Sequence, residues 1–579
     1  MWPFTREAYP EVKLEKTENE YDYIICGGGT AGCVLANRLS ANPSTRVLVV
    51  ERGPIADSWT SRVPLFSSDF ASDGSRTYIR PSESQGKLAS KSFDLYSGRV
   101  LGGTSRINQM IYSRGLPAEY DAWRDAGRVG WGWEDMKPYF LKSERANYKG
   151  DASVHAQTGE WHNSTSEDFE FRGFNKTITA CENLGLPYID DINSPSHPPF
   201  GCGRLHFTRD SNAYRNSTFH AFLPKKLVIQ RKKNLHICTG SIVEKLEIDA
   251  RRNVRGVHLA SGRVTKLVRA AGEVVLSAGP FASPQILMLS GIGPAHHLKE
   301  LDIPIIKNLP AVGSNLEDHL GVSIAFRAPM KDSLLSLERS IWVFFVEFFR
   351  YILFGTGMLL APVLQLAIFT SSQFLDTRGV PTKTKLASSK SVPDIEIMPM
   401  AYDSGDSKKW DKSKGVYSFL NVLLHPKSKG SVKLTSRDPT ASLNIDLNYL
   451  SDQSDFGPLR AALRLTLRIR DNMRALGYPL VDWEVPAGED DGALDDFIRR
   501  PTRNRSTYHY SSTCRMAPED DKDGGGVVDD ELKVHGLKGL RVADSSVFPW
   551  VLGAHLQAPT VAVAEKCADM MLQEARKLA

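Results

Sequence analysis

Two histidines near the C-terminal end of the chain have the side chain best suited to exchanging protons at neutral pH. His509 stands in the segment YHYSSTCRM (508–516), and His555 stands in LRVADSSVFPWVLGAHLQAP (540–559), which also holds Asp544. These segments predict acid–base chemistry. Histidines are more often surface or hydrogen-bonded core residues, and we expect that structural role for three others, His319, His425 and His535.

A glycine-rich turn near the N-terminus has the spacing of a dinucleotide-binding site. An apolar strand, Tyr23–Cys26, leads into Gly27-x-Gly29-x-x-Gly32, and a helix over Ala31–Leu39 and a second strand over Arg46–Val50 follow. Glycines let the backbone approach a pyrophosphate, and the helix N-terminus offers free N–H groups and the positive end of its dipole. Glu51 follows the glycines by about twenty residues, where an acid can bond ribose hydroxyls. The segment therefore predicts a nucleotide-binding βαβ unit.

Two further glycine-rich segments mark places where the backbone must turn tightly. The first, GRVLGGTSRIN (98–108), combines Gly102-Gly103 with two hydroxyl residues. The second, GPFASPQILMLSGIGP (279–294), predicts a helix that starts at Ser283-Pro284, because proline suits a first helical turn. We expect this helix to end at Ser290-Gly291, since glycine is common just past a helix.

The composition narrows the class of protein. At 579 residues the chain is too long for one hydrophobic core, so we expect two domains or one elaborated α/β unit. The net charge of +5 comes without a long basic run, which argues against a nucleic-acid partner. Seven cysteines lack the paired spacing of a zinc site, so we expect reduced, buried thiols and no metal.

The chain ends give an expectation about location. The first twenty residues lack the apolar stretch of a secretory signal. The last three, Lys577-Leu578-Ala579, do not match the peroxisomal address. We therefore expect an intracellular, cytoplasmic protein.

The order of strand-like and helix-like segments predicts a mixed α/β fold. Short apolar strands such as Glu273–Ala278 are typical of a buried parallel sheet. Further along, long helical patterns such as Pro458–Leu476 alternate with strands such as Tyr417–Leu424. The expected divisions are an N-terminal extension (1–20), a first domain (21–324) with a loop-rich excursion at about 146–199, an inserted second domain (325–500) and a return to the first domain (501–579).

One segment, 341–369, is unusually rich in aromatic and aliphatic residues. Glu347 and Arg350 interrupt it and glycines break it, so it lacks the run of about twenty apolar residues that a membrane-spanning helix needs. We expect a pair of buried or groove-lining helices. The alternative is a monotopic patch that admits apolar substrates from a membrane, and this membrane association is not favoured.

Taken in order, these motifs resemble the glucose–methanol–choline (GMC) family of flavin oxidoreductases over nearly the whole chain. The order is G-x-G-x-x-G with Glu51, then GRxLGG(S/T)SxxN at 98–108, GPxxSPQxLxxSGIGP at 279–294, and the two histidine segments. The resemblance implies an α/β fold in which a Rossmann-like FAD-binding domain carries an inserted substrate-binding domain, built on an antiparallel sheet and helices. It also implies FAD as the cofactor.

The resemblance further implies which residues hold FAD. The pyrophosphate would lie in the first glycine turn, the adenosine ribose at Glu51, and the adenine against the Val243 backbone. The flavin would lie along the second glycine-rich segment, and Asp544 would bond the ribityl or phosphate region. The implied cofactor residues are Gly27, Gly29, Thr30, Ala31, Gly32, Glu51, Gly103, Asn108, Val243 and Asp544.

By the same resemblance, His509 and His555 would be the active-site pair at the flavin N5 edge. Removing hydride from an alcohol carbon requires the hydroxyl proton to leave as well, and a neutral imidazole can take it while a second group bonds the developing alkoxide. We expect His509 as the base and His555 as its partner. The reverse assignment stays open.

Three departures from the family pattern carry consequences. Ser512 replaces the usual glycine of H-x-x-G-T, so its side chain either narrows the approach to the flavin or is accommodated by a local shift. Ile107 stands where some relatives have the histidine that binds FAD covalently, so we expect non-covalent FAD. Trp550 would bring an aromatic wall to the site and favour an apolar or aromatic substrate over a sugar.

The expected function is an FAD-dependent oxidation of a CH–OH group in a small-molecule alcohol, with O2 or a quinone as electron acceptor. A role in secondary-metabolite biosynthesis is a further expectation. The alternatives are a non-redox member of the family, of the hydroxynitrile lyase or photodecarboxylase type, or a catalytically silent flavin-binding protein. The presence of both histidines argues against these alternatives.

Overall fold

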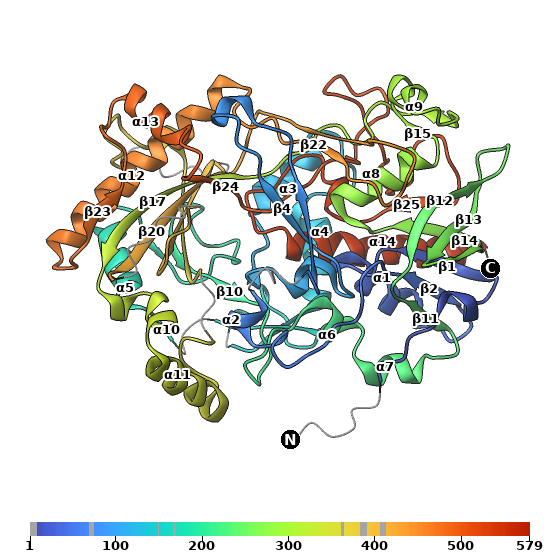
Figure 1. The fold of residues 1–579 in the computed structure, drawn as a ribbon, viewed down its shortest axis with the longest axis horizontal. Helices are drawn as coiled ribbons and strands as arrows, with labels where there is room; N and C mark the ends of the chain where they lie inside the picture. The colour runs from blue at the N-terminus through green and yellow to red at the C-terminus, as the bar shows by residue number, and fades with distance from the viewer. Residues whose placement is uncertain are drawn as a thin grey trace.

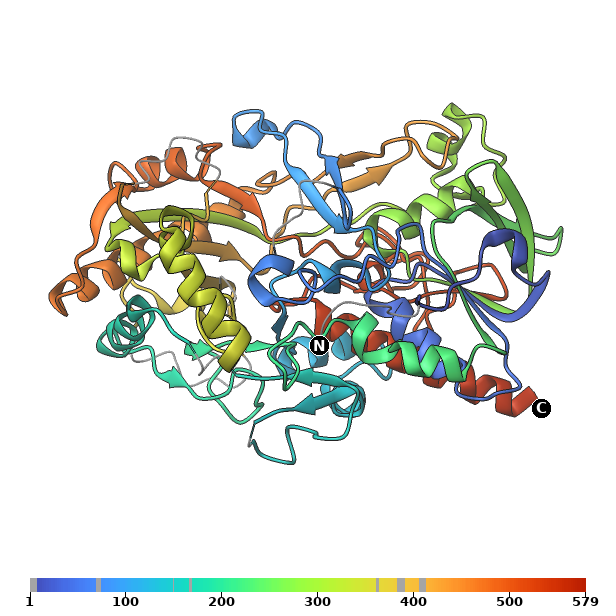
Figure 2. The same ribbon diagram turned by 60° about the horizontal axis from the view of Figure 1, so that its bottom comes forward.

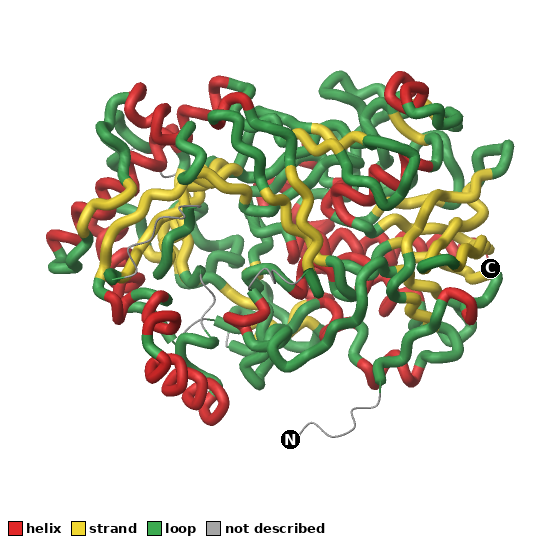
Figure 3. The backbone as a smooth tube through the Cα atoms, viewed as in Figure 1, coloured by secondary structure: helices red, strands yellow, loops and turns green. Residues whose placement is uncertain are grey.

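The computed structural model describes residues 8–68, 74–148, 150–165, 169–360, 364–382, 391–405 and 413–578. Strands gather in two groups on opposite sides of the molecule (Figure 3). The expected mixed α/β fold is confirmed. Each group is one large sheet, and the segments between the sheets carry most of the motifs identified above (Figure 1).

The first sheet contains the predicted βαβ unit. Strand β1 lies between β2 and β14 in parallel register, with Ile25 paired to Val49 on one side and to Val275 on the other. All three of these side chains are buried, which explains why the strands are continuous apolar runs. The strand order is β11 (Leu235–Cys238), β2 (Val47–Val50), β1 (Glu20–Cys26), β14 (Val264–Leu276), β13 (Val254–Ser261) and β12 (Ile242–Ile248), with β25 (Leu540–Val542) also paired to β14.

The helix that follows β1 brings the two ends of the chain together. Helix α1 (Thr30–Leu39) packs against α14 (Gln557–Leu578), the last helix of the chain (Figure 1). Arg38 of α1 forms an ion pair with the buried Glu565 of α14, at 2.6 Å. The chain therefore returns at its end to the dinucleotide-type turn, and His555 lies two residues before α14 begins.

The second sheet is largely antiparallel. Helices α12 (Phe456–Ala475) and α5 (Arg172–Asn183) pack together, and α12 also packs on β19 and β20. The strand order is β23 (Val481–Glu484), β17 (Leu320–Ala328), β20 (Gly415–Leu423), β19 (Ile395–Met400), β18 (Leu366–Thr370), β9 (Gly201–Arg204) and β8 (Tyr188–Ile189), and β24 (Asn504–Ser506) also pairs with β17.

The stretch expected to be loop-rich, 146–199, contains regular structure. Helix α5 buries Phe174, Thr177 and Cys181, which are spaced three and four residues apart on one helical face. The apolar residues of α5 repeat with the period of a helix, so this signal is present in the sequence, and the surrounding glycines, prolines and asparagines led to the loop prediction. Strands β8 and β9 then join the second sheet from outside the expected range 325–500.

Helix α8 (Gly279–Leu289) starts four residues before the predicted Ser283-Pro284. Pro284 lies inside the helix and has no N–H for the carbonyl of Pro280, one turn earlier. The hydroxyl of Thr513 donates to that carbonyl instead, at 2.6 Å. A side chain from the His509 segment therefore replaces the missing helical bond. The predicted end is confirmed, with Ser290 as the C-cap and Gly291 at a φ of +77°.

The apolar segment 341–369 does not form the expected pair of buried helices. Its first half is a single helix, α11 (Ile341–Phe354), which lies at the edge of the molecule (Figures 1 and 2). Its second half leads into β18, a buried strand of the second sheet, and residues 361–363 lie outside the described part of the chain. Among the described residues, no helix is both long and apolar enough to cross a bilayer.

Candidate active site

A cavity of about 350 Å³ lies between the two sheets and joins the motifs at both ends of the chain. At one end it is lined by the turn from β1 to α1, through Gly27 and Gly29. At the other end it is lined by Leu364, by Met398 of β19 and by both His509 and His555. The fold therefore brings the predicted glycine turn and the two predicted histidines to the same cavity.

The glycine turn is packed so closely that side chains would not fit. A Cβ atom on Gly27, whose φ is +108°, would lie 2.6 Å from the carbonyl oxygen of Ser277. A Cβ on Gly103 would lie 2.7 Å from the Cα of Gly29, so the second glycine-rich segment rests directly on the first. Bare backbone at the start of α1 thus faces the cavity, which is the surface that a pyrophosphate needs.

Eleven of the twelve predicted site residues line this cavity. The exception is Gly32, which packs under the turn, where a Cβ would lie 1.9 Å from the carbonyl oxygen of Gly27. Its role in the structure is to let α1 approach β1. The residues that line the cavity are Gly27, Gly29, Thr30, Ala31, Glu51, Gly103, Asn108, Val243, His509, Asp544 and His555.

Glu51 is held rigidly at the edge of the cavity. One carboxylate oxygen accepts from the N–H of Gly28 at 3.0 Å, and the other accepts from the N–H of Gly53 at 2.7 Å. Burial raises the pKa of Glu51 to about 7, against the opposing effect of these two hydrogen bonds. Each oxygen keeps a second lone pair, so the side chain fits the recognition of ribose hydroxyls.

Asp544 and Asn108 are fixed by hydrogen bonds in the same way. One oxygen of Asp544 accepts from the backbone N–H of Gly279, at 2.8 Å, and from the Ser283 hydroxyl, at 2.6 Å, and so caps α8. The Asn108 amide donates to Gln557 at 2.9 Å and accepts from Arg215 at 2.8 Å. Charged and polar groups around the cavity are therefore preorganised, and the residues present fit FAD.

The two histidines face each other across the other end of the cavity. Their ring centroids are 4.8 Å apart and their planes are perpendicular. Neighbouring imidazoles at this distance affect each other's proton affinity, because a positive charge on one disfavours a positive charge on the other.

Two consecutive residues hold His509 in place. The carboxylate of Asp318 accepts from the backbone N–H of His509 at 2.6 Å, and Nδ1 of His319 lies 3.0 Å from Nδ1 of His509. Burial lowers the pKa of His509 well below its usual value, and the neighbouring His555 and His319 lower it further. His509 is therefore a neutral imidazole at pH 7.

His555 has a different partner. Its Nε2 lies 3.1 Å from the carboxylate of Glu396, a buried residue of β19. A carboxylate at one ring nitrogen fixes the orientation of an imidazole. The pair thus joins a histidine whose Nδ1 has only neutral partners to one whose ring is held by a carboxylate.

His319 is a buried, hydrogen-bonded residue, which is one of the two roles expected for it, and its partner is His509. Burial, followed by the neighbouring His425 and His555, lowers its pKa well below the usual value. His535 keeps the expected structural role, since its Nε2 bonds the Ala517 carbonyl at 2.8 Å. His425 also lies near the site, with Nε2 3.6 Å from a carboxylate oxygen of Glu119.

Sequence reasoning missed Asp318, His319 and Glu396. The available signal was the group Glu317-Asp318-His319, which stands directly before the buried strand β17. Charged residues at the end of a buried strand are candidates for a site, because their burial is costly without a partner. Glu396 gave a similar signal as the one acid inside the buried strand β19.

Two of the departures noted in the sequence do not affect the cavity. Ser512 is buried but is not part of the cavity lining, so it does not narrow the approach to the flavin site. Its φ is +69°, in the left-handed region that favours glycine, which explains the family's preference there. Trp550 packs on the core and does not line the cavity, so the expected aromatic wall is wrong.

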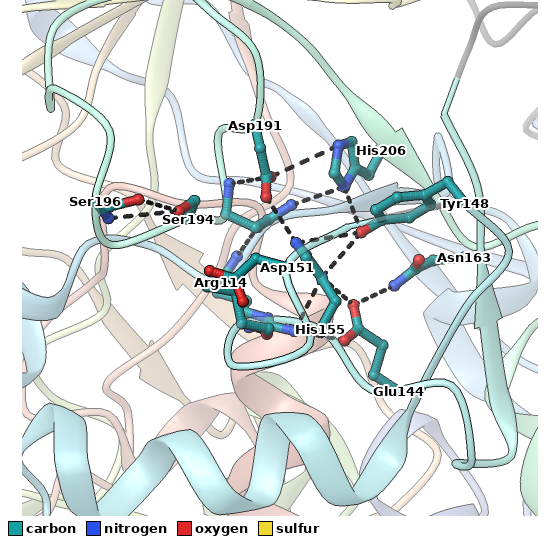
Figure 4. Close-up of polar contacts among 12 residues, drawn as sticks. Arg114, Glu144, Tyr148, Asp151, His155, Asn163, Asp191, Ser194, Ser196 and His206 are labelled. Atoms are coloured by element: carbon teal, nitrogen blue, oxygen red, sulfur yellow. Dashed lines mark hydrogen bonds and ion pairs between the residues drawn. The ribbon is translucent and has the colours of Figure 1, made fainter.

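A second cluster of buried histidines lies outside the cavity (Figure 4). His155 bonds the carboxylates of Glu144, at 2.9 Å, and Asp191, at 2.6 Å. The hydroxyl of Tyr148 lies 3.0 Å from Nδ1 of both His155 and His206. Among the described residues, no group of histidine, cysteine and acidic side chains is arranged to hold a metal ion.

A parallel sheet with a glycine turn, a cavity running from that turn, and a histidine pair at its far end define an FAD-dependent oxidoreductase that acts on alcohols. Two family models described as GMC oxidoreductase match the chain, over residues 21–321 and 426–564. The chain belongs to the GMC oxidoreductase family.

Similar proteins share this architecture over nearly their whole length. An oxygen-dependent choline dehydrogenase of Photobacterium profundum is 33% identical over 95% of this chain and 93% of that protein. The crystal structure of pyridoxine 4-oxidase from Mesorbium loti has a TM-score of 0.80 at 28% identity, covering 95% of this chain and 98% of that one. A fungal aryl-alcohol oxidase has a TM-score of 0.81 at 26% identity, covering 97% and 100%. These names give no support to the expected role in secondary-metabolite biosynthesis.

Proposed function

We propose that the protein oxidises an uncharged alcohol of apolar or aromatic character. The observation that carries the proposal is the distribution of charge along the cavity. Of the described residues that line it, only Glu51 and Asp544 are acidic, and both lie against the glycine-rich segments assigned to FAD. Near the histidines the described lining holds no carboxylate but does hold Arg505, and the Glu396 carboxylate, which is not part of the lining, is bonded to His555. A quaternary ammonium substrate such as choline would therefore meet a positive charge in this described lining and no carboxylate.

The lining near the histidines supports the same class of substrate. Leu364, Met398, Met400 and Leu420 form an apolar wall, and Tyr402 adds an aromatic ring. Burying an apolar group against such a wall stabilises binding by about 25 cal/mol for each Å² removed from water. An aliphatic or aromatic alcohol would gain this stabilisation, and a sugar would not.

His509 is proposed as the base that takes the hydroxyl proton. The Thr507 hydroxyl donates to the carbonyl of His319 at 3.0 Å, so its oxygen is free to accept from Nδ1–H of His509, 3.2 Å away. Nδ1 of His319, 3.0 Å from Nδ1 of His509, acts as a second acceptor for the same Nδ1–H proton of His509. This arrangement favours the tautomer with the proton on Nδ1, and Nε2 then carries the lone pair that removes the alcohol proton.

His555 is proposed to donate to the substrate oxygen as negative charge develops there. Glu396 would hold the ring and balance the charge of an imidazolium. When bound, FAD supplies the acceptor for the hydride that leaves the carbon. The acceptor that reoxidises the cofactor, O2 or a quinone, is part of the same proposal, and FAD is proposed to bind without a covalent bond because Ile107 offers no nucleophile.

The test is anaerobic mixing of the FAD-loaded protein with benzyl alcohol, 1-hexanol, choline and glucose, followed by the loss of flavin absorbance. We expect benzyl alcohol and hexanol to reduce the flavin at concentrations at least about tenfold below those needed for choline. Reduction by choline at the lowest concentration would contradict the assigned substrate class. Peroxide release in air then distinguishes an oxidase from a dehydrogenase.

A further inference from the structure

Helix α11 lies on the outside of the molecule (Figure 2). It presents a wide apolar face that is exposed in the described part of the chain. Eight of its fourteen residues are large apolar side chains that are 45 to 77% exposed. Their exposed area is on the order of 1,000 Å², whereas the largest apolar patch on an ordinary monomer is roughly 300–600 Å². The exposed residues are Ile341, Trp342, Phe345, Val346, Phe349, Ile352, Leu353 and Phe354.

The opposite face fixes the helix to the protein. Phe344 stacks on Phe66 with ring centroids 6.4 Å apart, and Phe348 meets Trp59 at 6.0 Å. The hydroxyl of Tyr351 donates to the Ala213 carbonyl at 3.0 Å. The exposed face is therefore held outward by a packed inner face.

The acidic side chain of the helix is turned into the protein. Glu347 is buried and accepts from the N–H of Met358 at 2.7 Å. The chain after α11 can approach Glu347 this closely because residue 357 is glycine. A Cβ there would lie 2.4 Å from the Glu347 carboxylate. At the helix start, Ser340 accepts from the N–H of Val343. The eight exposed apolar side chains carry one polar group, the indole N–H of Trp342. The one charged side chain exposed on the helix, Arg350, lies 3.7 Å from the Glu347 carboxylate.

We propose that α11 is a membrane-docking helix that inserts this face into the headgroup–acyl boundary of a bilayer containing anionic phospholipids. At fourteen residues the helix is about 21 Å long, shorter than the roughly 30 Å hydrocarbon core, so it lies along the surface. A face with Trp and Phe on one side and no charge is typical of interfacial helices.

The chemistry of the patch favours lipid over a second protein surface. Stable protein interfaces form about one hydrogen bond for each 100–200 Å², and this face offers one donor in an area several times larger. Among the described residues from 331 to 360, the exposed charged ones are three cations, Lys331, Arg339 and Arg350, and one acid, Glu338. This net positive charge complements anionic headgroups.

The test is co-sedimentation of the FAD-loaded protein with phosphatidylcholine vesicles that contain 30% phosphatidylglycerol. We expect the wild-type protein to bind, and the triple variant Trp342→Gln/Phe349→Gln/Leu353→Gln to bind on the order of 100-fold more weakly. Vesicles of phosphatidylcholine alone should bind the wild type about tenfold more weakly. Vesicles with brominated acyl chains should quench the fluorescence of the wild type more than that of Trp342→Phe.

The matched control is Val129→Gln/Val481→Gln, which removes two equally exposed apolar side chains elsewhere on the surface. This control should bind vesicles like the wild type, and both variants should keep the flavin spectrum and the rate of flavin reduction by alcohol. Equal vesicle binding by the wild type and the triple variant would overturn the proposal. So would a wild-type dimer that the triple variant converts to a monomer without any vesicle binding, because a second copy would then cover the face.

Discussion

In the described part of the chain, two groups of histidines point into the protein, and their surroundings differ in a way that separates a reactive site from a structural one. His509 and His555 line a cavity, and their ring centroids are 4.8 Å apart. His155 and His206 are 6.0 Å apart and lie outside that cavity, among Glu144, Asp191 and Tyr148 (Figure 4). Three of these four histidines are buried and His509 is half-buried, so burial alone does not identify a reactive histidine.

The difference lies in the state of the ring nitrogens. Both nitrogens of His155 bond carboxylates, and although burial lowers its pKa, the bonds from Asp191 and Glu144 outweigh burial and raise it. His509 has only neutral partners at Nδ1, and burial with neighbouring histidines lowers its pKa. A histidine whose two ring nitrogens both bond carboxylates holds loops together. A neutral histidine beside a cavity can accept a proton.

The largest expected effect is on His509. Replacing His509 by Ala should leave FAD bound but slow flavin reduction by alcohol about 10²–10⁴-fold, because the alcohol proton loses its acceptor. Stopped-flow absorbance under anaerobic conditions measures this rate. His206→Gln, in the other pair, should leave the rate within about twofold of the wild type. Equal slowing by both variants would end the distinction between the two pairs.

The second effect concerns the charge network of the structural pair. Arg114 and Glu144 form a fully buried ion pair at 2.7 Å, and Glu144 also accepts from His155 and from Asn163. Glu144→Gln keeps the shape but leaves the guanidinium without its counter-charge, so we expect the free energy of unfolding to fall by about 3 kcal/mol. Denaturant titration measures this loss.

The control for Glu144→Gln is Glu134→Gln, an exposed acid at the start of α4 (Trp133–Ser143), which should change stability by less than about 1 kcal/mol. At a given flavin content, the rate of flavin reduction should be unchanged in both variants. A loss of rate without a loss of stability in Glu144→Gln would place this network in the active site and contradict the comparison.

The third effect is the pH dependence that His206 of the structural pair contributes to stability. Burial lowers the pKa of His206 from 6.5 to about 4. As pH falls below 6.5 the unfolded chain takes up this proton and the folded chain does not, so stability is lost between pH 6.5 and 4. Over this window the wild type should lose about 2–3 kcal/mol more than His206→Gln, as measured by thermal unfolding at each pH. Parallel curves for the two proteins would show that His206 does not titrate as proposed.

The contrast also shows which features a sequence reveals. The glycine turn, the strands around Ile25 and the two histidine segments are local patterns, and local patterns carry the fold class and most of the cavity lining. His319 could not be assigned, because its partner His509 is 190 residues away and only the paired strands β17 and β24 bring the two together. The exposed face of α11 was expected only as the less favoured alternative, a monotopic patch, since its composition matches that of a buried helix.

Contacts across the fold also override local rules. Pro284 predicts a helix start because proline lacks an N–H, yet α8 continues through it, since Thr513 supplies the donor. Glycine is favoured in the family at position 512, yet Ser512 is tolerated in the left-handed region. The sequence around Pro284 does not show that Thr513 will supply a donor. The sequence around Ser512 does not show that its backbone will be left-handed.

The smallest expected effect comes from that strained backbone, which distinguishes the two histidine pairs once more. Tyr508 and Ser512 flank His509 with φ values of +63° and +69°, whereas none of the histidines or acids of the structural cluster has a positive φ. Left-handed geometry costs a non-glycine residue about 1 kcal/mol, so Ser512→Gly should raise the free energy of unfolding by roughly 0.5–1 kcal/mol. The control, Ser511→Gly at an ordinary φ, should lower it. Because Ser512 does not line the cavity, flavin reduction should be unchanged; a slower reaction in Ser512→Gly would mean that strain in this loop helps to hold His509 in its reactive position.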